Sequence, residues 1–355
     1  MKQTILLLLL FLLNGSSIFA QQKAAAEELI QEGIVLHDKG NYEAAIAKYD
    51  QSLQLDKDNF YALHEKAMSL MYLQKYKESI ELCQKAMEIH PDKNLSVLYV
   101  VYGNSYDGLN NNAKALEIYD EGIAKYPDSY ELHYNKGIAL IGAQEYDKAL
   151  LSFQTAIIHN PLHASSHNAI GRVQYGKDKR IAALLAYSRF FVLESDSKRA
   201  KENFEIVQRI MNGNVEKTGK RSVTININAG MLADTTADGK PNENSFATAD
   251  LLLSMASAIV LDKKSGKKTP VEQFMKKFET VCSSLAETRK DNYGFYWEYY
   301  APYFTEMMDK KFIETFSYIV FINSGDPDII KWIKKHKEEI EAFYEWSENY
   351  VWSKK

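Results

Sequence analysis

The 355-residue sequence has few cysteines and little net charge, and each shortage excludes a class of protein. Two cysteines cannot form a disulfide framework. Cys83 and Cys282 lie in different halves of the chain, and Cys83 falls at a position expected to pack inside a helical hairpin, so we expect two buried thiols rather than one long-range bridge. A formal net charge of -4 gives no bulk attraction to phosphate, and no nucleic-acid partner is expected.

Local catalytic motifs are also missing. The sequence has no G-x-S-x-G elbow, P-loop, H-E-x-x-H or C-x-x-C. His159, His163 and His167 are spaced by four residues, which on one helix would suggest a metal site, but Pro161 lies between the first two. We therefore expect solvated turn histidines, with no metal, cofactor or catalytic residue. An active site assembled from distant carboxylates leaves no local trace, so an enzyme remains an alternative.

The first twenty residues differ from the rest of the chain. Lys2 supplies a positive start, residues 5–13 form an uninterrupted apolar run, and Ala20 ends the segment before Gln21. This pattern is typical of a secretory signal peptide. The alternative is a membrane anchor, but a span needs about 20 apolar residues and this run stops at Asn14. We expect cleavage after Ala20 and an exported protein, periplasmic or secreted, without a transmembrane anchor.

Residues 26–197 contain an internal repeat with a period of 34 residues. The segment Gly40–Ile46 recurs in altered form as Gln144–Leu150, 104 residues later, which is three periods plus two. The two extra residues lie near Lys93, where the third unit begins late. This register predicts five units, with the following bounds: 26–59, 60–93, 96–129, 130–163 and 164–197.

Equivalent positions of the units carry similar residues. Position 8 is small in every unit: Gly33, Ala67, Gly103, Gly137 and Gly171. Position 20 is also small: Ala45, Ser79, Ala115, Ala149 and Ala183. Position 24 is usually large and aromatic: Tyr49, Cys83, Tyr119, Phe153 and Tyr187. Position 32, where proline ends a helix, is proline in the three middle units: Pro91, Pro127 and Pro161.

This pattern resembles the tetratricopeptide repeat (TPR) family over residues 26–197, about half the chain. The resemblance implies a mainly α fold, an α-solenoid of five helical hairpins that bury their apolar faces against their neighbours. The fifth unit departs most, with Arg180 where an apolar residue usually stands. Residues 198–211, with Phe204, Val207 and Met211 on one stripe, are expected to form a capping helix.

The resemblance also implies a binding face, because certain first-helix positions line the concave side of such arrays. In this chain the groove residues are Ile34, His37, Tyr61, His64, Met68, Met71, Val100, Asn104, Tyr134, Ile138, Ile141, Asn168, Arg172 and Tyr175. They are mostly apolar and aromatic, so we expect a protein or peptide partner presenting an amphipathic helix or an extended apolar segment. The set does not match the family's carboxylate clamp. The alternative is that the chain's own second half covers this face.

The second half of the chain has a different character. Residues 212–221 are polar and are interpreted as a linker, and residues 222–228 alternate like a single strand with no evident partner. Residues 222–355 are then predicted to form a small helical domain with one strand-like arm. Its first helix starts at Ala247, its second has an N-cap at Thr269, and a long final helix starts at Asp326. On the first of these helices the predicted buried face consists of Leu251, Leu252, Met255, Ile259 and Val260.

Aromatic residues are concentrated late in the chain. All four tryptophans follow residue 296, and residues 293–304 are dominated by aromatic side chains. Such density usually indicates a core, but several faces of one helix are aromatic, which leaves a second binding surface open. The candidates for it are Tyr296, Trp297, Tyr300 and Tyr303.

The sequence thus predicts an exported TPR scaffold or adaptor that binds a protein or peptide through an apolar groove and has no catalysis of its own. The alternative function is an enzyme or a small-ligand receptor, for example for a sugar, that uses the aromatic-rich domain.

Overall fold

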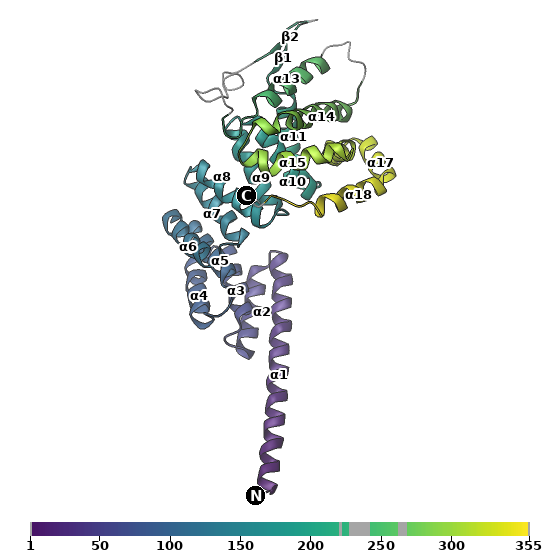
Figure 1. Ribbon diagram of the computed structural model, residues 1–355. Helices are drawn as coiled ribbons and strands as arrows, with labels where there is room; N and C mark the ends of the chain where they lie inside the picture. Colours follow the sequence, from purple (N-terminus) through teal and green to yellow (C-terminus); the bar gives the residue numbers. More distant parts are fainter. Residues whose placement is uncertain (1, 220–221, 227–241, 262–267, 354–355) are drawn as a thin grey trace. The chain divides into compact units, whose positions relative to one another are not determined.

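The computed structural model describes residues 2–219, 222–226, 242–261 and 268–353, and these form two compact units that divide after Ser152 (Figure 1). The division falls inside helix α8 (Tyr146–His159), within the fourth repeat. It does not fall at residues 212–221, where the sequence suggests a linker. The reason is that the fifth hairpin shares its core with the helices that follow it, as described below.

The first unit is a row of helical hairpins. Its helices are α1 (Lys2–Asp38), α2 (Tyr42–Leu55), α3 (Phe60–Tyr72), α4 (Tyr76–Ile89), α5 (Ser96–Gly108), α6 (Asn112–Lys125) and α7 (Tyr130–Gly142), followed by the start of α8. Each helix packs on the next along the chain, and α1, α3, α5 and α7 also contact one another in that order. The first helices of successive hairpins therefore form one continuous layer.

The turn inside every hairpin has the same geometry. A residue in the left-handed region, with φ between 56° and 79°, recurs at position 15 of each 34-residue unit. These residues are Gly40, Gln74, Asn110, Gln144 and Asp178. Only the first is glycine, the residue that enters this region without steric cost. The interval is 36 residues between the second and third turns and 34 elsewhere, so the two extra residues lie before α5.

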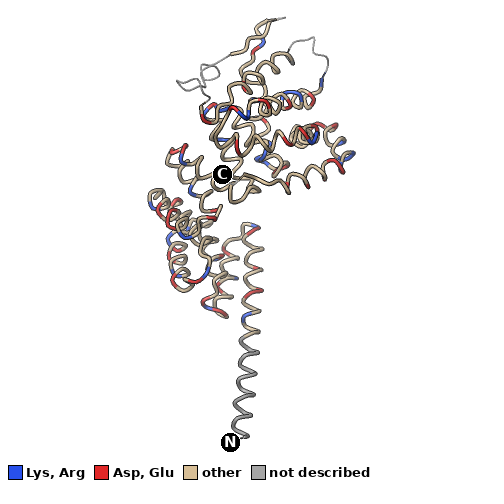
Figure 2. Tube along the Cα trace, viewed as in Figure 1, with Lys and Arg blue, Asp and Glu red and all other residues tan. Residues whose placement is uncertain are grey.

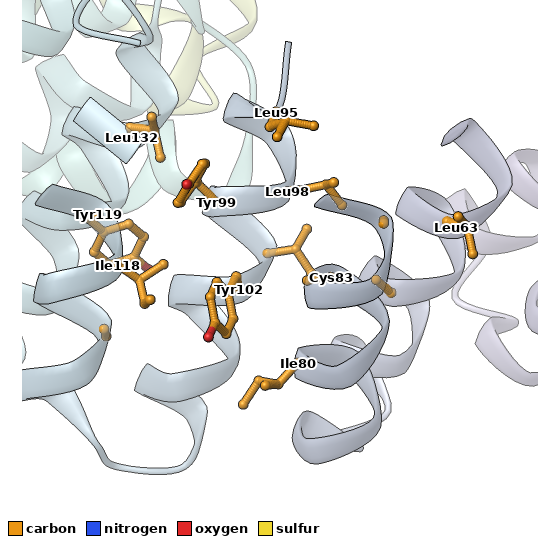
Figure 3. Close-up of a cluster of buried hydrophobic side chains, with 14 of the residues drawn as sticks. Leu63, Ile80, Cys83, Leu95, Leu98, Tyr99, Tyr102, Ile118, Tyr119 and Leu132 are labelled. Atoms are coloured by element: carbon orange, nitrogen blue, oxygen red, sulfur yellow. The ribbon is translucent and has the colours of Figure 1, made fainter. Parts of the chain in front are cut away.

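A glycine and a tyrosine pack against each other inside the hairpins. A Cβ atom added to Gly103 would lie 2.3 Å from the Tyr119 ring, and one added to Gly33 would lie 2.3 Å from the ring of Tyr49. In the second hairpin the equivalent pair is Ala67 and Cys83, where a smaller partner leaves room for a methyl group. Buried side chains of α3 to α7, with Ala67, Cys83 and Tyr119 among them, form one cluster, and Figure 3 draws 14 of its residues; Tyr49 belongs to a second cluster with Ile30 and Ala45.

The second unit is built around α10 (Arg180–Leu193). Its other helices are α9 (Ala164–Gly176), α11 (Lys198–Asn212), α13 (Ala247–Leu261), α14 (Pro270–Thr288), α15 (Phe295–Asp309), α16 (Ile313–Phe321), α17 (Pro327–Lys335) and α18 (Lys337–Glu348). Helices α9, α11, α13, α15 and α16 all contact α10. Every side chain of α10 from its first residue to Val192 is buried, so the helix is the core of the unit.

Three expectations for the second half need correction. Residues 223–225 form strand β2, which pairs antiparallel with β1 (Val215–Lys217), so a strand of a small hairpin lies within the predicted linker. The final helix is two helices, α17 and α18, that meet at His336. On α13, Met255 and Ile259 are exposed, whereas Leu253 is buried. The side chain of Val260 lies outside the described residues.

Other details agree with the sequence. Thr269 caps α14 through a reciprocal capping box with Glu272. Both cysteines are free and buried. Among the residues that the structure describes, no helix is long and apolar enough to cross a membrane.

Candidate functional site

The predicted groove residues of the first unit lie on the layer of first helices. Tyr61 on α3 is 63% exposed and Ile138 on α7 is 40% exposed, with Val97 on α5 between them in the order of the helices. The remaining predicted residues of this unit are half-buried: Ile34, His37, His64, Met68, Met71, Val100, Asn104, Tyr134 and Ile141. Apolar surface is therefore available on adjacent helices of the same layer.

Two polar members of this set are already bonded within the unit. The Tyr119 hydroxyl donates to Asn104 Oδ1 at 2.6 Å, which uses the amide oxygen. His37 Nδ1 lies 2.7 Å from Ser69 Oγ, and its ring meets Tyr42 and Tyr72 edge to face. These groups orient the layer from within. Asn104 Oδ1 and His37 Nδ1 are therefore already used within the unit.

The predicted groove residues of the second unit differ in their exposure to solvent. Asn168 is buried, and its Oδ1 accepts a hydrogen bond of 2.9 Å from Asn203 of α11. The capping helix thus covers Asn168, which is not a groove residue. Arg172 is exposed and Tyr175 is half-buried.

The predicted second surface on α15 is not a surface. Tyr296, Trp297, Tyr300 and Tyr303 are all at most 2% exposed. Their polar atoms bond inside the unit: Trp297 Nε1 donates to the Ser245 carbonyl at 2.7 Å, and Gln174 of α9 donates to the Tyr296 hydroxyl. Burial raises the pKa of Tyr296 to about 12. Tyrosine combines a large apolar area with a hydroxyl that reaches polar groups, so α15 packs closely against the fifth hairpin.

His167 shows how complete this coverage is. Its Nε2 lies 3.0 Å from the Pro161 carbonyl, and its Nδ1 lies 2.7 Å from the Tyr300 hydroxyl. A carbonyl only accepts, so Nε2 carries the proton and Nδ1 accepts from Tyr300. Burial, reinforced by the nearby charge of Arg189, lowers the pKa of His167 to about 3. The ring is thus a neutral core group and not the solvated turn histidine that the sequence suggests.

Arg180, the residue that departs from the repeat pattern, has a structural role. Its Nη1 lies 2.8 Å from Asp250 Oδ1 of α13, and its Nη2 donates to the Ile210 carbonyl at 2.8 Å. The carbonyl belongs to the last turn of α11, where backbone acceptors lack helical partners. Arg180 therefore joins α10, α11 and α13, which explains why a charge replaces the usual apolar residue.

Comparison with known proteins identifies the repeats. Models described as "TPR repeat" and "Tetratricopeptide repeat" match residues 33–67, 58–128 and 103–161. Residues 33–161 are therefore a TPR segment.

The matches to individual proteins are partial. The chain is 26% identical over 189 residues to Protein O-mannosyl-transferase TMTC1 of Homo sapiens, which covers 52% of this chain and 21% of that protein. It is 32% identical over 125 residues to the Protein STIP1 homolog of Dictyostelium discoideum, which covers 34% of this chain and 22% of that protein. The chain thus spans about a fifth of the length of these relatives.

A solved structure, the thermophilic TPR protein TTC0263 of Thermus thermophilus, aligns with a TM-score of 0.44 at 18% identity and covers 52% of this chain and 97% of that chain.

Proposed function

We propose that this chain is an exported TPR scaffold that binds a protein or peptide partner through the layer formed by α1, α3, α5 and α7, and that it has no catalytic activity. One observation carries the proposal: Tyr61, Val97 and Ile138 are exposed on three neighbouring first helices of the TPR segment. Apolar side chains repeated in this way on adjacent helices offer a continuous strip to one extended ligand.

The chemistry of the strip favours an apolar segment of the partner. Met68 and Met71 are half-buried beside the exposed residues, and methionine adapts its shape to different apolar ligands. Figure 2 shows Lys interspersed with Asp and Glu along the helices of this unit, and the acidic residues are in excess: residues 21–152 contain 21 Asp and Glu, 13 Lys and no Arg. The partner should therefore be recognised by apolar anchors, and the acidic excess disfavours a partner segment that is itself acidic.

Two matched substitutions, one on a first helix and one on a second helix of the hairpins, test this surface. Ile138→Glu introduces a charge on the first-helix layer, and Leu55→Glu introduces the same change at an equally exposed apolar residue, 39%, on α2. A photo-crosslinking residue at position 138, but not at position 55, should trap a defined partner in the producing cells. Peptides from that partner should bind wild type and Leu55→Glu alike and Ile138→Glu at least about tenfold more weakly. Equal binding by all three proteins would exclude the layer as the site.

The proposed export is supported by the N-terminal helix. Loss of residues 1–20 would leave Gln21–Asp38 of α1, and the first side chains of this part that are buried are Ala26 and Ile30. Cleavage after Ala20 would thus spare the contacts that hold α1 to α2. N-terminal sequencing of the protein from the exported fraction should begin at Gln21. A protein that keeps Met1 and stays inside the cell would contradict the proposal.

A further inference from the structure

Arg189 is a charged side chain in the centre of the second unit. It lies on α10 and has no exposed surface. Its guanidinium carbon is 5.0 Å from the ring centres of both Tyr303 and Trp352. Its Nη1 donates to Ser347 Oγ at 2.6 Å and to the Tyr303 hydroxyl at 3.1 Å. One side of the guanidinium is thus held firmly by aromatic faces and hydroxyls.

The rest of the guanidinium has no partner. Nε and Nη2 of Arg189 are buried without a hydrogen-bond acceptor, and no carboxylate among the described residues forms an ion pair with this side chain. Arg180, on the same helix, has Asp250 as its counter-ion. A buried charge is costly unless it is paired, and two aromatic faces compensate only part of that cost. The charge of Arg189 therefore has no counter-ion among the described residues.

A cavity of about 300 Å³ gives an anion a place. Arg189, Ser195 and Ser347 supply polar lining, Leu162, Val192 and Leu193 supply apolar walls, and Tyr344 adds an aromatic side chain with a hydroxyl. The exposed Glu348 also lines it. Its volume is at the lower end of the range for small-molecule sites. The walls favour an apolar body, and the negative charge of Glu348 disfavours a ligand with a second negative charge.

We propose that this cavity binds a small monocarboxylate with an apolar body, whose carboxylate pairs with Arg189. A carboxylate matches the planar fork of a guanidinium, which provides two parallel donors. Ser347 and Tyr303 hold Nη1 through hydrogen bonds and the rings of Tyr303 and Trp352 lie over the guanidinium, so the guanidinium is fixed before the ligand arrives. The site is separate from the first-helix layer of the first unit and does not depend on the scaffold function.

Hexanoate is a suitable probe, with hexanamide as its neutral counterpart and inorganic phosphate as a polyanion. All four tryptophans lie in the second unit, so tryptophan fluorescence reports its melting directly. Hexanoate at about 10 mM should raise the melting temperature, and titration calorimetry should give a Kd below about 1 mM. Hexanamide and phosphate should leave the melting temperature unchanged.

Three variants locate the effect. Arg189→Met should weaken hexanoate binding at least tenfold, and a melting scan without ligand shows whether it folds. Leu193→Phe fills the cavity and keeps the guanidinium, so it should abolish hexanoate binding as well. It tests the proposal even if Arg189→Met does not fold. Glu348→Gln changes an exposed residue and should tighten binding severalfold by removing a repulsive charge.

Equal effects of hexanoate and hexanamide, or binding that survives Arg189→Met or Leu193→Phe, would overturn the proposal.

Discussion

Helices α6 and α10 are second helices of the same type of hairpin, yet their surroundings differ. Both have 14 residues. Helix α6 buries one stripe, formed by Ala115, Ile118, Tyr119 and Gly122, whereas α10 buries every side chain from Arg180 to Val192. The repeat pattern determines how a hairpin folds on itself. The elements that follow it determine whether the hairpin remains part of an open row or becomes the core of another unit.

Two histidines at the same repeat position show this difference in one side chain. His133 and His167 both stand at position 4 of their units, and each places Nε2 near the carbonyl of the preceding proline, at 2.8 Å from Pro127 and 3.0 Å from Pro161. His133 remains partly exposed, while His167 is enclosed by α15. A local bond is thus repeated, and only the second copy becomes a core group.

The largest expected effect separates buried from exposed aromatic residues. Trp297→Ala removes a side chain that stacks on Phe246 at 4.6 Å and is 2% exposed, so it should destabilise the second unit by about 3–5 kcal/mol. Tyr61→Ala, on the open layer of the first unit, should change stability by no more than about 0.5 kcal/mol. Urea unfolding followed by fluorescence and circular dichroism compares the two variants. Similar losses of stability in the two variants would contradict the difference in burial between Trp297 and Tyr61.

The second effect depends on pH. His167 has a pKa of about 3 in the folded state and 6.5 ordinarily, so the unfolded chain takes up the proton first as the pH falls. The folded state should lose stability from pH 6.5 downward, by about 3 kcal/mol at pH 4, and the loss should be complete near pH 3. His167→Gln should flatten the slope of stability against pH between 4 and 6.5. Equal slopes in the wild type and the variant would contradict the burial of His167.

The third effect concerns the glycine and tyrosine pairs of the first unit. Gly103→Ala places a methyl group against the Tyr119 ring and should cost about 1–3 kcal/mol. Combined with Tyr119→Cys, which recreates the Ala67 and Cys83 pair of the second hairpin, the alanine should cost less than it does alone. Circular dichroism is the appropriate probe, because residues 1–152 contain no tryptophan. Strict additivity of the two changes would rule out the pairing.

The smallest effect compares two lysines. Lys66 in the first unit lies 2.6 Å from Asp50 Oδ1, whereas the buried Lys277 in the second donates, among the described residues, to the amide oxygen of Asn212 alone. Burial lowers the pKa of Lys277 to about 8, from an ordinary 10.5. Below pH 8 the amine of Lys277 is charged in both the folded and the unfolded protein, so the folded protein bears the full cost of desolvating that charge. This cost decreases as the pH rises from 8 to 10.5, because the folded protein then holds the amine in its neutral form.

Lys277→Met should therefore stabilise the protein by on the order of 1 kcal/mol at pH 7, with a gain that shrinks between pH 8 and 10.5. Lys66→Met should give no such gain. A pH-independent effect of Lys277→Met would show that its amine is not desolvated.

The helices of the repeats could be predicted from the sequence because their signals are local. Small residues at positions 8 and 20 and prolines at position 32 all act within one hairpin or between neighbours. The capping box at Thr269 is local in the same sense. The apolar residues of the first-helix layer follow from the same register, and Tyr61 and Ile138 are exposed as a binding face requires.

The misses arise where distant segments decide burial. The aromatic residues of α15 look like a second surface until Gln174 and His167 of α9 are found to bond to Tyr296 and Tyr300. On α13 the stripe with Met255 and Ile259 is as apolar as the buried side, so the pattern alone does not select the correct face. Arg189 gave no signal, because its importance lies in partners more than 100 residues away in the chain.

The burial of the two thiols has a consequence for the redox chemistry of the chain. Desolvation raises the pKa of Cys83 to about 12 and also raises that of Cys282. The thiolate is the form that attacks disulfides and reacts with oxidants, and at neutral pH almost none is present in either case. In the oxidising compartment that the proposed export implies, the folded protein would keep both sulfurs reduced without any reductant, because neither can be reached or activated.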